Sequence, residues 1–161
     1  MSRAFVKEGD GGLDPLPDMP LSPHPNYVTL RGLAGLQARL AVRQGDLAAL
    51  KSRADRLDKL PEAAAERDIR YLEARLRSAI PVPPAAALTE VAFGLYVTVG
   101  GQTTYQITGE DQACAALHRI APQSPLARAL MGAQVGDVVI WRKPSGPVEL
   151  QVTRIALDPP A

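Results

Sequence analysis

The sequence has very little that could build a covalent or metal-bound framework. It contains one cysteine, Cys114, and two histidines, His24 and His118, in 161 residues. A single cysteine excludes an internal disulfide framework and any Cys-rich zinc site. Neither histidine has a neighbour that would complete a nucleophile–base pair. We therefore expect no catalytic residue, no metal site and no cofactor of its own.

The chain also lacks an excess of charge and a long apolar run. Lys and Arg number 18 against 17 Asp and Glu, which gives a formal net charge of +1. General nucleic-acid binders carry a clear excess of basic groups, so this class is disfavoured. No apolar run approaches the roughly 18 residues of a membrane span, and the N-terminus lacks the order of a signal peptide. These features predict a cytoplasmic protein without a membrane partner.

Proline and glycine are concentrated in two places and thereby divide the chain. Residues 9–26 contain five prolines and three glycines and cannot bury enough apolar surface to fold, so residues 1–26 are predicted to be a flexible tail. Pro81, Pro83 and Pro84 predict an extended linker over 81–88. The two segments that remain, 27–80 and 89–157, are the predicted folded parts of the chain.

Residues 27–80 have the pattern of an antiparallel helical hairpin. Apolar side chains recur at alternating spacings of three and four, with Arg43 as the one polar member of the seam: Leu33, Leu36, Leu40, Leu47, Leu50, Ala54 and Leu57, then Ala65, Ile69, Leu72, Leu76 and Ala79. Pro61 fits the first turn of a second helix and breaks the first. The pattern predicts one helix over 29–58, with a break near Gly45 as an alternative, and another over 61–79. Pairing of the seam with a second chain is the competing interpretation, although we expect a monomer.

Although the net charge of the whole chain is close to zero, the predicted hairpin is basic. Residues 29–80 hold eleven Lys and Arg against seven Asp and Glu, whereas the segments before and after are mildly acidic. A solvated helical face is the ordinary interpretation of such residues. Basic groups around the turn would also favour contact with phosphate.

The last part of the chain predicts a small antiparallel sheet with one short helix, so the fold class is α+β. Gly100-Gly101 separates two β-prone runs over 91–99 and 102–108. Residues 138–141 and 148–155 flank a Pro-Ser-Gly-Pro turn and form a second hairpin. Ser124 and Pro125 are typical of a helix start, and Gly132 of its end.

Several blocks together resemble the bacterial Gre family of transcription elongation factors. The most specific are Tyr105-Gln-Ile-Thr-Gly-Glu-Asp, Ser124-Pro-Leu-Ala-Arg-Ala-Leu-Met-Gly and Val135-Gly-Asp-Val-Val. Asn26-Tyr-Val-Thr-Leu-Arg-Gly and the run 66–76 resemble the two coiled-coil helices. The resemblance implies an FKBP-like C-terminal domain that docks on RNA polymerase, and a coiled coil that enters the secondary channel.

The resemblance also implies which residues would act. Docking would involve the loop and short helix at Gln123, Ser124, Pro125, Leu126 and Arg128. In the family, two carboxylates at the hairpin tip help the polymerase bind Mg²⁺ and cleave backtracked RNA, chemistry that needs hard oxygen ligands near a phosphodiester. Any cleavage would be carried out by the polymerase, on its own Mg²⁺, and not by this chain.

The tip of this hairpin departs from the family pattern. The family's acidic tip motif is missing, Gly45-Asp46-Leu47 is only a superficial match inside the first helix, and the hairpin is expected to be about two heptads shorter. The carboxylates that remain near the turn are Asp55, Asp58 and Glu62, which would equally suit helix ends. Candidate contacts with nascent RNA or the channel are Arg53, Arg56 and Lys59. We therefore expect weak or absent stimulation of cleavage.

Two alternatives stay open beside a regulator of elongation. A non-cleaving relative could inhibit transcription or compete with other channel-binding factors. A different class, an FKBP-type peptidyl-prolyl isomerase, rests on fold analogy alone. Such an enzyme needs a deep aromatic pocket, and the sheet offers only Phe93, Tyr96, Tyr105 and Trp141.

Overall fold

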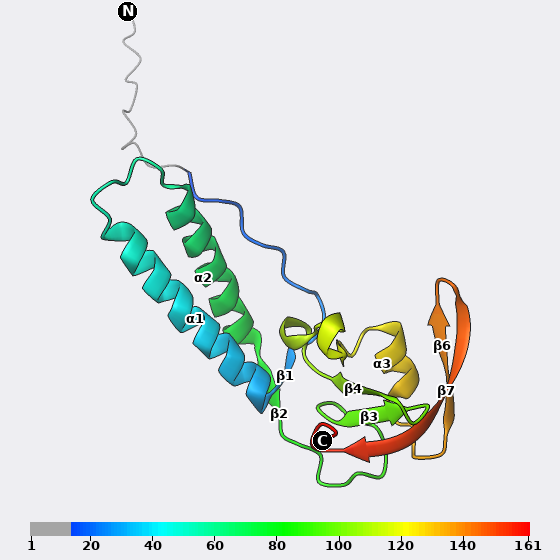
Figure 1. The fold of residues 1–161 in the computed structure, drawn as a ribbon. Coiled ribbons are helices and arrows are strands. Elements are labelled where there is room, and N and C mark those ends of the chain that lie inside the picture. The colour runs from blue at the N-terminus through cyan, green and yellow to red at the C-terminus, as the bar shows by residue number, and fades with distance from the viewer. Residues whose placement is uncertain (1–13) are drawn as a thin grey trace, which may run out of the picture.

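The helical hairpin and the sheet domain form two distinct parts of the chain, and the hairpin projects away from the sheet (Figure 1). The computed structural model describes residues 14–161. Helix α1 spans Leu30–Lys51 and helix α2 spans Leu60–Ser78. The predicted α+β class, with a hairpin preceding a mainly antiparallel sheet and one short helix, is confirmed.

The first helix is shorter than the predicted span of 29–58. It begins where Thr29 caps it, since the Thr29 Oγ1 accepts a hydrogen bond from the Gly32 amide at 2.9 Å. It ends at Lys51, and the next residue, Ser52, caps it, since the Ser52 amide donates to the Ala48 and Ala49 carbonyls. Pro61 lies in the first turn of α2, as predicted. Ala54 and Leu57, expected in the seam, therefore lie in the loop between the helices.

The seam itself holds the two helices together as the spacing predicts. Leu36 and Leu72 are fully buried, and Leu33, Leu40 and Leu76 pack against them. Arg43, the polar member of the seam, forms an ion pair across the hairpin with Asp68, at 3.0 Å. An ion pair thus continues the seam where a leucine is missing, and the helix does not break at Gly45.

A short parallel strand pair closes the base of the hairpin and was not predicted. Strand β1, Tyr27–Thr29, pairs with β2, Ile80–Val82, immediately before α1 and after α2. Pro81 and Val82, expected in the linker, therefore belong to β2. Proline is tolerated there because a strand in a two-stranded pair has a free edge.

The sheet domain contains five strands in the order β5-β4-β3-β7-β6. Its elements, with two 3₁₀ turns, are β3 Tyr96–Val99, β4 Thr103–Ile107, η1 Glu110–Gln112, η2 Ala115–Leu117, β5 Arg119–Ile120, α3 Pro125–Leu130, β6 Val138–Lys143 and β7 Gly146–Ala156. Both predicted hairpins are present. The β3 strand starts later than the predicted 91, because the chain turns at Gly94 with φ of 86°.

The core of this domain lies where α3 packs against the sheet. Leu95, Val97, Ile107 and Val152 from the sheet side and Leu130 from α3 are fully buried. Strand β5 runs parallel to β4 and was not predicted. Within residues 14–161, the helices are too short or too polar to span a membrane.

The proline-rich segment 14–26 runs along α2 (Figure 1). Arg70 donates to the Asp18 carboxylate at 2.6 Å and to the Leu16 carbonyl at 2.7 Å, and Ser22 donates to Glu110 at 2.8 Å. A flexible tail was expected over 1–26, but these polar contacts give its second half a defined path. Residues 1–13, the rest of the predicted tail, lie outside the described residues.

Candidate functional site

The N-terminus of α3 presents a small exposed surface built on a helix cap. The Ser124 Oγ accepts a hydrogen bond from the Ala127 amide at 3.3 Å, and Pro125 occupies the first helical position. Pro125 and Arg128 are exposed, while Ser124 is half-buried. The expected docking region therefore offers one apolar ring and one guanidinium on the same short helix.

Two of the five expected docking residues point elsewhere. Leu126 is 3% exposed and packs in the sheet core, so a direct contact with a partner is excluded for it. The Gln123 amide oxygen is buried and accepts no hydrogen bond from any residue in 14–161. The burial of Leu126 could have been foreseen, because Leu126 and Leu130 stand four apart on one helical face.

Each of the three expected carboxylates at the hairpin tip accepts a hydrogen bond from a group within the chain. Asp55 Oδ1 accepts from the Leu57 amide, and Asp58 Oδ1 accepts from the Leu60 amide, both at 3.0 Å. Glu62 is 5% exposed and accepts two hydrogen bonds from Arg56, at 2.9 and 2.6 Å. The hydrogen bonds from Arg56 lower the pKa of Glu62 below its usual value, against the opposing effect of burial.

This arrangement does not resemble a metal site. Over the described range 14–161, no three His, Cys, Asp or Glu side chains are grouped so that they could hold a metal ion. Divalent Mg²⁺ prefers carboxylate oxygens that remain open to it. The Glu62 oxygens are occupied by a guanidinium, and one oxygen each of Asp55 and Asp58 holds a turn.

The expected basic contacts at the tip are also partly occupied. Arg53 donates to the Leu50 carbonyl at 3.1 Å and to the Asp58 carbonyl at 3.2 Å. Arg56 is bound to Glu62. Lys59 is half-buried, and its charge contributes to lowering the pKa of the nearby Glu62 carboxylate.

Five polar residues with no predicted role connect the hairpin to the sheet domain. Arg75 is 3% exposed and donates to Asp111 at 2.6 Å, to Asn26 Oδ1 at 2.6 Å and to Glu110 at 3.5 Å. Tyr71 also donates to Asp111, at 2.8 Å. Burial and the bond to Asp111 raise the pKa of the Tyr71 hydroxyl. We name Asn26, Tyr71, Arg75, Glu110 and Asp111 the junction cluster.

Two further contacts tighten this junction. The Thr29 hydroxyl bonds to Gln112 Oε1 at 2.7 Å, so the same 3₁₀ turn also holds the start of α1. Gly109 lies so close to the Tyr27 carbonyl that a Cβ atom at this position would collide with it. The turn η1 therefore contacts the proline-rich segment, α1 and α2 at once.

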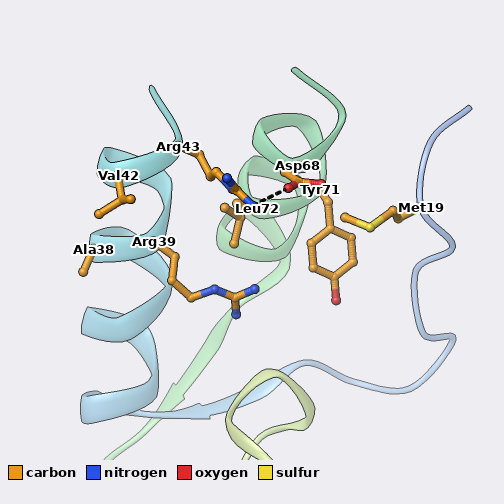
Figure 2. A pocket seen from close by; sticks show the side chains of 8 residues that line it. All are labelled: Met19, Ala38, Arg39, Val42, Arg43, Asp68, Tyr71 and Leu72. Atoms are coloured by element: carbon orange, nitrogen blue, oxygen red, sulfur yellow. Dashed lines mark ion pairs between the residues drawn. The ribbon is translucent and has the colours of Figure 1, made fainter. Parts of the chain in front are cut away.

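A cavity of about 570 Å³ lies between α1, α2 and the proline-rich segment. Figure 2 shows Met19 beside Tyr71 on one side of it and Val42 on the other, with the Arg43–Asp68 pair across it. Its lining holds no cluster of polar groups that converge on one point. It is lined by the seam residue Leu72 and by none of the expected docking or tip residues.

Comparison with known proteins points to one family. The family model described as transcription elongation factor GreA/GreB, C-terminal, matches residues 86–157. GreA from Pseudomonas syringae pv. tomato is 37% identical over 97 residues, which cover 56% of this chain and 61% of that protein. GreA from Legionella pneumophila (strain Corby) is 37% identical over 94 residues, covering 54% and 59%. The chain thus spans about three fifths of the length of these curated relatives.

Solved structures were compared as well. The GreA factor homolog 1 (Gfh1) of Thermus thermophilus is 23% identical, with 82% of this chain and 99% of that chain covered and a TM-score of 0.38. A GreA/GreB factor from Nitrosomonas europaea is 18% identical, with 81% and 98% covered and a TM-score of 0.38.

Proposed function

We propose that the chain is a member of the GreA/GreB family of transcription elongation factors, whose C-terminal model matches residues 86–157, and that it regulates elongation by binding RNA polymerase. The α3 surface of the sheet domain would dock on the enzyme, and the hairpin would enter the secondary channel. The family resemblance supplies this mode of action. The exposed Pro125 and Arg128 on a capped helix start are what this chain offers for docking.

The hairpin tip carries the proposal about mechanism. A factor that stimulates RNA cleavage must bring open carboxylate oxygens to a Mg²⁺ ion. Here Glu62 is bound twice by Arg56, and Asp55 and Asp58 each hold a backbone turn. We therefore infer that the chain occupies the channel without stimulating cleavage, which favours an inhibitor or a competitor of other channel-binding factors.

Docking is tested by Pro125→Glu in a polymerase pull-down. Glutamate is well suited to the first turn of a helix, because it complements the helix dipole, so this variant is expected to fold. Binding is expected to be lost. Pro144→Glu, an exposed proline in the turn between β6 and β7, is the matched control and should bind normally. Equal binding by both variants would refute docking through α3.

The second test is a transcript-cleavage assay on backtracked polymerase complexes. The chain is expected to leave the transcript intact and to slow cleavage by an added cleaving factor in proportion to its concentration. Robust cleavage with the chain alone would contradict this expectation. Asp55, Asp58 and Glu62 would then be the residues to replace first.

A peptidyl-prolyl isomerase is not supported by any observation at the sheet domain. The two cavities beside Tyr96 have neither Phe93, Tyr105 nor Trp141 in their lining. Tyr105 instead lies against His118, with ring centroids 5.3 Å apart. A pocket with one aromatic ring does not provide the enclosure that such an enzyme needs.

A further inference from the structure

Leu57 stands out at the end of the hairpin. Its side chain is 94% exposed, the largest exposed fraction of any large hydrophobic residue within 14–161. Single exposed apolar residues are common on protein surfaces, so exposure alone carries little weight. What distinguishes Leu57 is the loop that holds it.

Polar side chains of this loop bond to its own backbone and to α2, and these bonds fix its shape. Asp55 accepts a hydrogen bond from the amide of Leu57 itself. Arg53 reaches along the loop to the Leu50 and Asp58 carbonyls, and Arg56 binds Glu62 at the start of α2. The groups that could have faced a partner are thus used to order the backbone, and Leu57 is displayed at its outer side. An apolar residue on an ordered loop loses little conformational entropy when it binds.

We propose that Leu57 is an anchor residue that enters an apolar pocket with an acidic rim in the protein wall of the polymerase channel. The proposal rests on the proposed function, which places the hairpin in that channel. Residues 51–59 hold four Lys and Arg against two Asp, so the surroundings of Leu57 are basic. Lys59 lies two positions away and would add its charge opposite an acidic group beside the pocket.

The same observations favour a protein pocket over RNA. Leucine has no π-face on which a base could stack and no donor for a phosphate. Guanidinium groups recognise phosphate best through an open fork of donors, and the forks of Arg53 and Arg56 are occupied within the loop. A tip built to hold RNA would leave those donors free.

Competition binding with purified polymerase and the full-length chain tests the proposal. Leu57→Ala removes most of the anchor, and the transfer free energy of the lost carbons corresponds to a roughly 10- to 30-fold weaker affinity. Leu57→Met keeps the volume and is expected to stay within about threefold of the original chain. The matched control is Leu117→Ala, since Leu117 is 60% exposed but lies in η2 of the sheet domain. Its affinity should be unchanged.

A photocrosslinking amino acid at position 57 identifies what the tip touches. In a complex with labelled transcript, we expect the crosslink to form with a polymerase subunit. A crosslink to RNA, or unchanged affinity of Leu57→Ala while Pro125→Glu abolishes binding, would overturn the anchor and leave the proposed function standing. If the original chain does not bind polymerase at all, the proposed function and the anchor both fall.

Discussion

Replacing Arg75 by methionine should destabilise the junction between the hairpin and the sheet domain more than any change at the hairpin surface. The Arg75 side chain is 3% exposed and that of its main partner, Asp111, is 10% exposed. Arg75→Met removes donors to Asp111, Asn26 and Glu110 but keeps the aliphatic volume. It leaves a nearly buried carboxylate whose only other side-chain donor among the described residues is Tyr71.

The expected cost is about 3 kcal/mol of unfolding free energy, the lower end of what is lost when one partner of a buried ion pair is removed. For a chain of this length, that corresponds to a fall in melting temperature of about 6–12 °C. The matched control is Arg43→Met. Arg43 also bridges two elements, through Asp68, but its side chain is 46% exposed. An exposed pair contributes about 0.5 kcal/mol.

Thermal unfolding followed by circular dichroism measures both variants. Amide exchange at residues 109–113 provides a local readout, because the Gly109 carbonyl accepts the Ala113 amide in the turn that Arg75 holds. We expect faster exchange there in Arg75→Met and unchanged exchange in Arg43→Met. If the two variants lose the same stability, the junction cluster does not hold the two parts together and the reasoning is refuted.

Two further predictions concern the cap of α3 and the tip. Ser124→Ala removes the oxygen that accepts the Ala127 amide and should cost about 1 kcal/mol in urea unfolding, whereas Ser145→Ala in the β6–β7 turn should cost nothing measurable. The hydrogen bond from Arg56 lowers the pKa of Glu62 below its ordinary value of 4.5. The ionised carboxylate therefore stabilises the folded tip fully at pH values above 4.5, and this stabilisation is lost as the pH falls through the lowered pKa of the folded state. The Nε–H resonance of Arg56, which bonds to Glu62, should report that loosening in acid, and Glu62→Gln should remove its pH dependence. Titration of this resonance at or above pH 4.5 would contradict the lowered pKa of Glu62.

The parts of the fold that local signals specify could be predicted from the sequence. The two glycines at 100–101 adopt positive φ in the turn between β3 and β4. Ser124 and Pro125 begin α3 as their preferences indicate. In each case, the residues that determine the turn or the helix start are adjacent in the chain, so the local sequence is sufficient to predict it.

The end of α1 could not be predicted in the same way. The spacing of apolar residues continues to Leu57, but a seam exists only where a second helix faces it. Helix α2 begins at Leu60, so the chain must leave α1 early enough to cross to it. The crossing takes residues 52–59, and Leu57 changes from an expected seam residue into the most exposed leucine of the tip.

The junction cluster was missed because its partners lie far apart in sequence. Arg75 and Asp111 are separated by 36 positions, and Asn26 lies 49 positions before Arg75. No periodicity or short motif relates such residues. The available signal was that Arg75 stands three positions after the seam residue Leu72, although this spacing does not say which acid Arg75 meets.

The position of the junction explains why Arg75 and Asn26 are buried polar residues at the base of the hairpin. Helix α1 has 22 residues and is therefore about 33 Å long. A rotation of about 10° at the base would displace the far end of such a helix by about 6 Å, more than any hydrogen bond or apolar contact tolerates. A leucine seam alone permits small rotations, because apolar contacts have no preferred direction, whereas Arg75 must satisfy Asp111 and Asn26 at the same time. If the tip acts inside a channel, as proposed, its position would depend on these directional bonds at the opposite end of the hairpin.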